Sequence, residues 1–173
     1  MKKKVAVAMS GGVDSSLTAA LLIEQGYDVI GVTMTLSDES REAGGSTAVS
    51  DAKKVADALN IPHYVVNYHK KFKDDVIKYF ISEYAKGRTP NPCVRCNNTV
   101  KFGSLLKDCL ELGADCVATG HYARIEQDEK TGRYLLKKGL DVRKDQSYVL
   151  YTLTQDVLKH FMLPLGNYSK EKT

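Results

Sequence analysis

The chain has 173 residues, of which 43% are hydrophobic and 27% are charged, and this balance is typical of a globular protein with a buried core. It excludes disordered and collagen-like chains. A chain of about 100–200 residues usually folds around one core, so we expect one domain over residues 1–173. The net charge of +4 permits a polyanionic partner without requiring one.

The sequence favours a cytoplasmic protein that has no membrane partner. No apolar run reaches the ~18 residues of a membrane span, and the apolar residues 5–9 are too few for a secretory signal. The four cysteines are Cys93, Cys96, Cys109 and Cys116. We expect free thiols, because a chain of this length has its own core and the cytosol disfavours disulfides.

Apolar periodicity alternates between strands and helices over the first 120 residues. The expected elements are a strand at 4–9, a helix at 14–25, a strand at 28–34, a helix at 48–60, a strand at 63–68, helices at 73–86 and 98–112, and a strand at 115–119. This order predicts an α/β fold, with a Rossmann-like parallel sheet of five strands and helices on both faces.

Irregular segments follow the expected strands and helices. A polar loop at 36–47 and a Pro-containing stretch at 87–92 are expected over the carboxyl edge of the sheet, where open α/β folds bind ligands. Beyond residue 120, the pattern predicts a hairpin over 122–136 and a short helix over 146–153.

A glycine- and serine-rich loop, residues 10–16, joins the first strand to the first helix. Its backbone N–H groups lie at the positive end of the helix dipole, which favours a bound phosphate. Asp14 supplies a carboxylate suited to Mg²⁺ on a pyrophosphate. The loop has neither the Gly-Lys-Ser/Thr nor the G-x-G-x-x-G pattern. The alternative is a turn that only caps the helix.

The loop sequence SGGVDSS resembles that of the PP-loop ATP pyrophosphatases. In that group the loop holds the pyrophosphate end of ATP while a substrate oxygen attacks the α-phosphate, which yields an adenylate and pyrophosphate. The loop alone does not choose among the enzymes of the group.

A second motif surrounds two cysteines at residues 89–98. It places Cys96 in a rigid loop just before a helix that we expect to start near Asn98. That helix N-terminus and Arg95 would lower the pKa of the Cys96 thiol and raise its reactive fraction. Such a cysteine can handle sulfur.

Together with residues 118–122 (ATGHY) and 144–148 (KDQSY), this motif resembles the tRNA-specific 2-thiouridylase family, which converts the C2 oxygen of the wobble uridine to sulfur. The resemblance implies an N-terminal PP-loop catalytic domain over residues 1–173, without the later domains of the family. The second catalytic cysteine of the family, which carries a persulfide, lies beyond this sequence. We therefore expect this chain to retain nucleotide binding and adenylation only.

The resemblance also implies roles for individual residues. Those expected to bind ATP are Ala8, Met9, Ser10, Gly11, Gly12, Val13, Asp14, Ser15, Met34 and Gly120. Those expected to contact the target base or tRNA are Asn91, Pro92, Cys93, Lys144, Asp145 and Gln146. Cys96 is the expected nucleophile, and Asp14 is the expected catalytic Mg²⁺ ligand. The partners implied are tRNA and a persulfide or sulfide donor protein.

Several alternatives stay open at this point. Many family members have Asp where this chain has Cys93, so Cys93 and Cys96 could instead ligate an iron–sulfur cluster completed by a further cysteine. Another PP-loop enzyme acting on a small molecule, or a non-catalytic ATP-binding module, would also fit the first motif. His121 is either a neighbour of the ligand or a structural histidine.

The remaining chemistry-bearing residues are interpreted as structural. Cys109 and Cys116 fall in a helix and an apolar strand, so both are expected in the core. Tyr79, Phe80 and Tyr84 follow helical spacing and are also expected to be buried.

Overall fold

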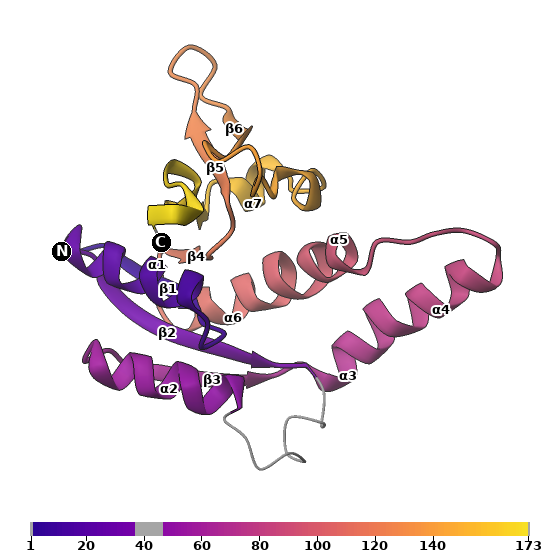
Figure 1. Ribbon diagram of the computed structural model, residues 1–173, viewed down its shortest axis with the longest axis horizontal. Coiled ribbons are helices and arrows are strands. Elements are labelled where there is room, and N and C mark those ends of the chain that lie inside the picture. Colours follow the sequence, from indigo (N-terminus) through magenta and orange to yellow (C-terminus); the bar gives the residue numbers. More distant parts are fainter. Residues whose placement is uncertain (1, 37–46, 173) are drawn as a thin grey trace.

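The computed structural model describes residues 2–36 and 47–172 (Figure 1). The polar loop expected at 36–47 therefore lies outside the described residues, apart from its two ends. None of the helices in the described ranges combines the length and the apolar content needed to cross a bilayer.

Five parallel strands form the central sheet, as the sequence predicts. In spatial order they are β3 (His63–Asn67), β2 (Asp28–Thr35), β1 (Lys4–Ala8), β4 (Cys116–Ala118) and β7 (Phe161–Met162). The chain leaves β1 on one side for β2 and β3, and reaches β4 on the other side. The carboxyl ends of β1 and β4 therefore flank the point where the strand order reverses, which is where ligands bind in such sheets. The two-residue β7 was not predicted, because it is too short to show a period.

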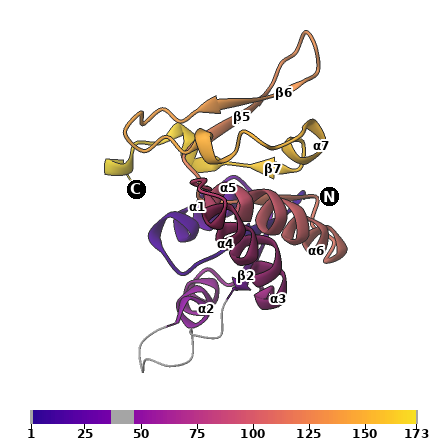
Figure 2. The same ribbon diagram turned by 90° about the vertical axis from the view of Figure 1, so that its right-hand side faces the viewer.

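Helices cover both faces of the sheet (Figure 2). On one face, α1 (Val13–Glu24) and α2 (Ala48–Ala58) pack small and apolar residues, such as Ala19, Leu22 and Ala52, against β1 and β2. On the other face lie two longer helical stretches. Their segments are α3 (His69–Phe72), α4 (Lys78–Ala85), α5 (Pro92–Cys96) and α6 (Leu105–Glu111).

Each of the two longer stretches contains a π-helical segment. Lys73–Ile77 joins α3 to α4, and Asn97–Ser104 joins α5 to α6. The second stretch begins at Pro92 and not near Asn98, which corrects the sequence-based boundary. The side-chain oxygen of Asn91 caps it by accepting hydrogen bonds from the N–H groups of Cys93 (3.0 Å) and Val94 (3.3 Å). Proline is suited to the first helical position because its missing N–H has no partner there anyway.

The C-terminal part of the chain packs beside the sheet. Strands β5 (Ala123–Gln127) and β6 (Tyr134–Lys138) pair antiparallel and confirm the expected hairpin. The helix expected over 146–153 is reduced to a 3₁₀ turn at Ser147–Val149, and α7 (Gln155–Leu158) follows. Gly166 lies so close to β5 that a Cβ there would stand 1.9 Å from the Ala123 carbonyl oxygen.

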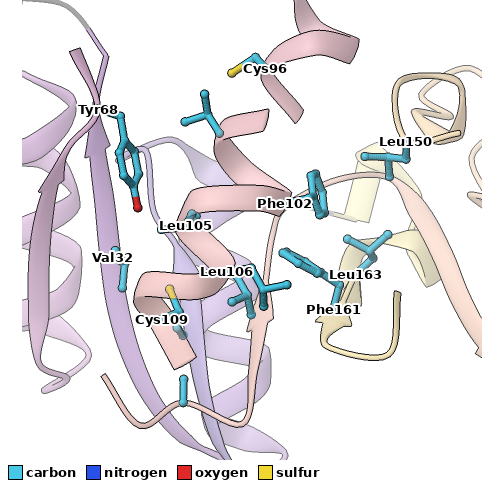
Figure 3. Close-up of a cluster of buried hydrophobic side chains, with 14 of the residues drawn as sticks. Val32, Tyr68, Cys96, Phe102, Leu105, Leu106, Cys109, Leu150, Phe161 and Leu163 are labelled. Carbon is cyan, nitrogen blue, oxygen red and sulfur yellow. The ribbon is translucent and has the colours of Figure 1, made fainter. Parts of the chain in front are cut away.

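A cluster of buried side chains joins the sheet, the second helical stretch and the C-terminal part (Figure 3). The ring of Phe102 packs on that of Phe161 with centroids 4.3 Å apart, and Leu150 and Leu163 lie beside them. Cys109 and Cys116 are buried, as expected.

The aromatic cluster expected on the preceding helix is not buried. Tyr79 and Tyr84 are exposed. Phe80 is half-buried, and its ring centroid lies 4.8 Å from that of Tyr84. Their helix, α4, extends away from the sheet (Figure 1), so helical spacing did not indicate a core face here.

Replacing Phe102 by Ala should lower the free energy of unfolding by about 3–5 kcal/mol, because the change leaves a cavity at the junction of three elements. Chemical denaturation measures this. Leu110→Ala on α6 is the matched control, since Leu110 is 38% exposed, and it should cost about 1 kcal/mol or less. Equal losses in the two variants would contradict the assigned core.

Candidate functional site

The loop between β1 and α1 forms a tight turn against α2. Gly11 has φ of +77°, and a Cβ at that position would lie 2.6 Å from the Cβ of Asp51. Only glycine combines this backbone conformation with such a close approach. The turn therefore has a fixed place between the sheet and α2.

Serine hydroxyls hold the turn from within. Ser15 donates a hydrogen bond to the Gly12 carbonyl (3.0 Å) and accepts one from the Ser10 N–H (3.2 Å). Ser16 donates to the same carbonyl (2.9 Å). The N-cap residue of α1 is Gly12, which has no side chain to accept hydrogen bonds from the amides of the first turn. These amides therefore remain available to an anion.

A cavity of about 230 Å³, here called the loop cavity, opens beside this turn. It contains most of the residues expected to bind ATP, namely Ala8, Met9, Ser10, Asp14, Ser15, Met34 and Gly120. Gly11, Gly12 and Val13 are not in its wall. The loop after β4 completes the wall with Thr119 and His121, the second helical stretch adds Lys101, and the residue before the 3₁₀ turn adds Gln146.

Asp14 is the acidic residue of the loop cavity, and it is already paired. Its Oδ1 accepts a hydrogen bond from the Tyr122 hydroxyl (2.9 Å) and forms an ion pair with Lys170. That pairing raises the pKa of Lys170. Gly120 lets the loop after β4 approach closely, since a Cβ there would be 3.0 Å from the Asp14 carbonyl carbon.

A second cavity of about 440 Å³, here called the cysteine cavity, adjoins the first. Its walls are largely apolar and include Phe72, Val76 and Val149. Pro92, Cys93 and Cys96 line it, as expected for residues around a base. The two cavities share Lys101, His121 and Gln146, so their contents would meet at these three side chains.

The two cysteines differ in a way that corrects the sequence-based argument. Cys93 is exposed in the first turn of α5, whereas Cys96 is buried at its last residue. Burial raises the pKa of the Cys96 thiol, and the nearby Lys101 charge acts in the opposite direction. Arg95 does not assist, because its Nε donates to the Asp75 carbonyl (3.0 Å) and its guanidinium stacks over Tyr79.

His121 is half-buried and lies in the wall of both cavities. Thr119 Oγ1 lies 2.7 Å from its Nδ1, and burial followed by the Lys101 charge lowers its pKa to about 4. The sequence marked His121 only as one of two alternatives, and it gave no sign of Lys101. The shared position of these two residues is recognised only in the folded structure, where the loop after β4 lies against the second helical stretch.

The three residues of the expected tRNA motif have different surroundings. Gln146 is in the wall of both cavities, and its Oε1 accepts a hydrogen bond from the Tyr122 N–H (3.0 Å). Asp145 accepts from the Gly139 N–H (2.9 Å) and from the Ser147 hydroxyl (2.8 Å), which fixes the local turn. Lys144 is exposed. Asn91 serves as the helix cap and does not line either cavity.

The described residues offer one carboxylate suited to Mg²⁺ and two of the thiol ligands that an iron–sulfur cluster would need. Mg²⁺ is commonly held by one or two carboxylates together with phosphate oxygens, and Asp14 offers such a carboxylate beside the anion-binding turn. A cluster needs about four ligands. Within residues 2–36 and 47–172, no group of three or more His, Cys, Asp or Glu residues has metal-binding geometry. Cys93 and Cys96 supply two such ligands, so the iron–sulfur alternative needs ligands from outside the described residues.

The family model described as the tRNA methyl transferase HUP domain matches residues 3–173, and the chain belongs to this family. It is 58% identical over 180 residues to tRNA-specific 2-thiouridylase MnmA 1 of Caldanaerobacter subterraneus subsp. tengcongensis. That match covers 99% of this chain and 50% of the relative, so the chain spans about half the length of the curated relatives it matches. The resemblance to the 2-thiouridylase family is confirmed.

Two solved structures confirm the fold. A 4-thiouridine synthetase in complex with RNA and ATP has a TM-score of 0.61 and 20% identity, covering 98% of this chain and 38% of that one. The U34-tRNA thiolase NcsA of Methanococcus maripaludis, solved with its [4Fe-4S] cluster, has a TM-score of 0.51 and 25% identity. This second match covers 69% of the present chain and 39% of the thiolase.

The four thiols should be alkylated in an order set by their exposure. Cys93 should react first and Cys96 more slowly, because burial keeps more of the Cys96 sulfur protonated. Cys109, with its pKa raised by burial to about 12, and the buried Cys116 should react only after unfolding. Timed alkylation followed by peptide mass spectrometry gives the order, and early labelling of Cys109 would contradict the structure.

His121 should stay neutral between about pH 5 and pH 8. Its folded-state pKa is below the unfolded value of 6.5, so its contribution to stability is complete above 6.5 and is lost as the pH falls towards 4. NMR of the ring protons and denaturation at several pH values measure the two effects. His121→Gln should flatten the pH dependence in this range, and a His121 titration near 6.5 would refute the assignment.

Proposed function

We propose that this member of the family binds ATP with Mg²⁺ in the loop cavity and adenylates the C2 oxygen of a tRNA uridine whose base enters the cysteine cavity. The observation that carries this proposal is the junction of the two cavities at Lys101, His121 and Gln146. An adenylating enzyme must hold the α-phosphate of ATP and the oxygen that attacks it within bonding reach of each other.

The loop cavity offers a matching group for each part of the nucleotide. The first-turn amides of α1 and the Ser10 hydroxyl suit the phosphates, and Ser15 holds the turn that presents them. Met34, near the end of β2, offers an apolar contact for adenine, and Gly120 borders the nucleotide. Asp14 would hold Mg²⁺, which when bound neutralises phosphate charge.

Adenylation solves the chemical difficulty of replacing a carbonyl oxygen. The uridine O2 forms a bond to the α-phosphorus, the bond from that phosphorus to the bridging oxygen breaks, and pyrophosphate leaves. A sulfur nucleophile then bonds to C2, the C2–O2 bond breaks, and AMP leaves in place of a poor leaving group. Backbone donors at the α1 N-terminus would stabilise the negative charge on the phosphate oxygens.

Cys96 is the thiol that we assign to the sulfur step. Cys96 is buried and lines the cysteine cavity together with Lys101. Cys93 also lines this cavity, but it is exposed in the first turn of α5. Sulfur would come from a persulfide or sulfide donor protein. After a persulfide sulfur has bonded to C2, attack by the Cys96 thiolate on the inner sulfur would form a disulfide and release the thiolated base, and an external reductant would restore the thiols.

The tRNA would bind chiefly through positive charge. Lys144 and Arg143 are exposed and would contact backbone phosphates, for which Arg143 would exchange its ion pairs with Asp141 and Glu171. Pro92 and Cys93 would border the flipped base, and Asn91 would act by capping the helix that carries them. Asp145 would contribute by fixing the turn that carries Arg143 and Lys144. We also propose a cytoplasmic location, where such a substrate is found.

Replacing Asp14 by Asn should weaken Mg²⁺-dependent ATP binding by about tenfold or more, because a charge-assisted contact contributes about 1.5–3 kcal/mol. Calorimetry with and without Mg²⁺ measures the effect, and tRNA-dependent AMP release measures the reaction. The control is Asp28→Asn, which alters an exposed carboxylate at the start of β2. Unchanged Mg²⁺-dependent affinity in the Asp14 variant would overturn the nucleotide site. AMP release at the same rate with and without tRNA would overturn the assignment of tRNA as the substrate.

A further inference from the structure

We propose that Lys101 is a catalytic residue of this site, whose ammonium group bridges the α-phosphate of the bound nucleotide and the sulfur of Cys96. This inference rests on the proposed function and adds to it the cation that serves both half-reactions. Lys101 is in the wall of both the loop cavity and the cysteine cavity. It is the only lysine or arginine in either wall among the described residues.

The π-helical segment places Lys101 on the same side of its helix as Cys96. A π-helix closes its hydrogen-bonded turn over five residues, where an α-helix uses four. The Leu105 N–H accordingly donates to the Val100 carbonyl. Cys96 and Lys101 are also five residues apart, so this winding stacks them much as residues four apart stack on an α-helix. Regular α-helical winding would turn them towards different sides.

The charge of Lys101 has no fixed counterion in the described part of the chain. Its side chain is half-buried, and the structure shows no salt bridge from it to any carboxylate of residues 2–36 or 47–172. The neighbouring acid of the loop cavity, Asp14, pairs instead with Lys170. A phosphate and a thiolate are the anions that these two cavities would supply.

Electrostatics agree with the geometry on both sides of Lys101. Its positive charge lowers the pKa of Cys96 against the larger effect of burial, and it lowers that of His121 as well. The other titratable group acting on Cys96 is Cys93, which raises its pKa. The same charge that favours the thiolate would also favour a pentavalent α-phosphorus, whose oxygens carry more negative charge than in ATP.

The proposed step is a phosphoryl-centre displacement followed by sulfur chemistry. While uridine O2 bonds to the α-phosphorus and pyrophosphate departs with the electrons of the broken bond, Lys101 stabilises the non-bridging oxygens. The uridine N3 proton passes to water. Once AMP carries the oxygen, the ammonium group stabilises both the departing phosphate and the Cys96 thiolate.

The test compares Lys101→Met with Lys101→Arg and with the control Lys107→Met. Lys107 lies on the same helical stretch, is exposed, and pairs with Glu111. Trypsin cuts after Arg95, so the alkylation of Cys96 is measured on a peptide separate from that of Cys93. At pH 7.5, Lys101→Met should slow Cys96 alkylation by about tenfold, because a nearby cation shifts a thiol pKa by about one unit or more. Lys101→Arg should restore most of the rate.

A kinetic readout separates this inference from the proposed function. With ATP, Mg²⁺ and tRNA, Lys101→Met should lower kcat for AMP release by about a hundredfold while KM for ATP changes much less, as for loss of a donor that acts in the transition state. Wild-type rates of Cys96 alkylation in Lys101→Met, or an equal loss in Lys107→Met, would overturn the role of Lys101. If the unaltered chain alkylates as expected but releases no AMP with tRNA, the proposed function fails and the thiol-activating contact stands.

Discussion

The contact between Gly120 and the first turn of α1 is the constraint on which the rest of the site depends. It brings the loop after β4 against the loop after β1, at the point where the strand order reverses. A methyl group at Gly120 would press on the Asp14 backbone and separate the two loops. With the loops together, the turn at residues 10–16 shares one cavity with Thr119 and His121, and the His121 ring lies against Phe102 of the second helical stretch.

Much of this arrangement could be predicted from the sequence. Buried parallel strands appear in the sequence as apolar runs. The loop at residues 10–16 is recognised by its two glycines and three serines directly after such a run. The hairpin of β5 and β6 is predicted by the strand-like residues on both sides of a turn near Gly132. The strand β7 could not be found, because two residues show no period and its pairing with β4 depends on a partner far away in the sequence.

The errors at the cysteines have a local cause. Asn91 followed by Pro92 is a favourable start for a helix, yet the prolines around it were interpreted as an irregular loop. The helix consequently begins one turn before Cys96, which buries that thiol and leaves Cys93 exposed. The importance of Lys101 could not be predicted, because it depends on a π-helical turn and on two cavities formed by segments distant in sequence.

The ion pair between Asp14 and Lys170 links the two ends of the described chain. Lys170 also donates its backbone N–H to Asp141 (3.1 Å), so one residue joins the α1 turn to the segment after the hairpin. A cation that takes the Asp14 carboxylate competes with Lys170 for it. If Asp14 holds Mg²⁺ as proposed, linkage requires that breaking the Asp14–Lys170 pair alter metal affinity, and that metal binding alter the stability of that pair by the same factor. Amide exchange at residues 139–170 would therefore report the occupancy of a site formed by residues 10–16.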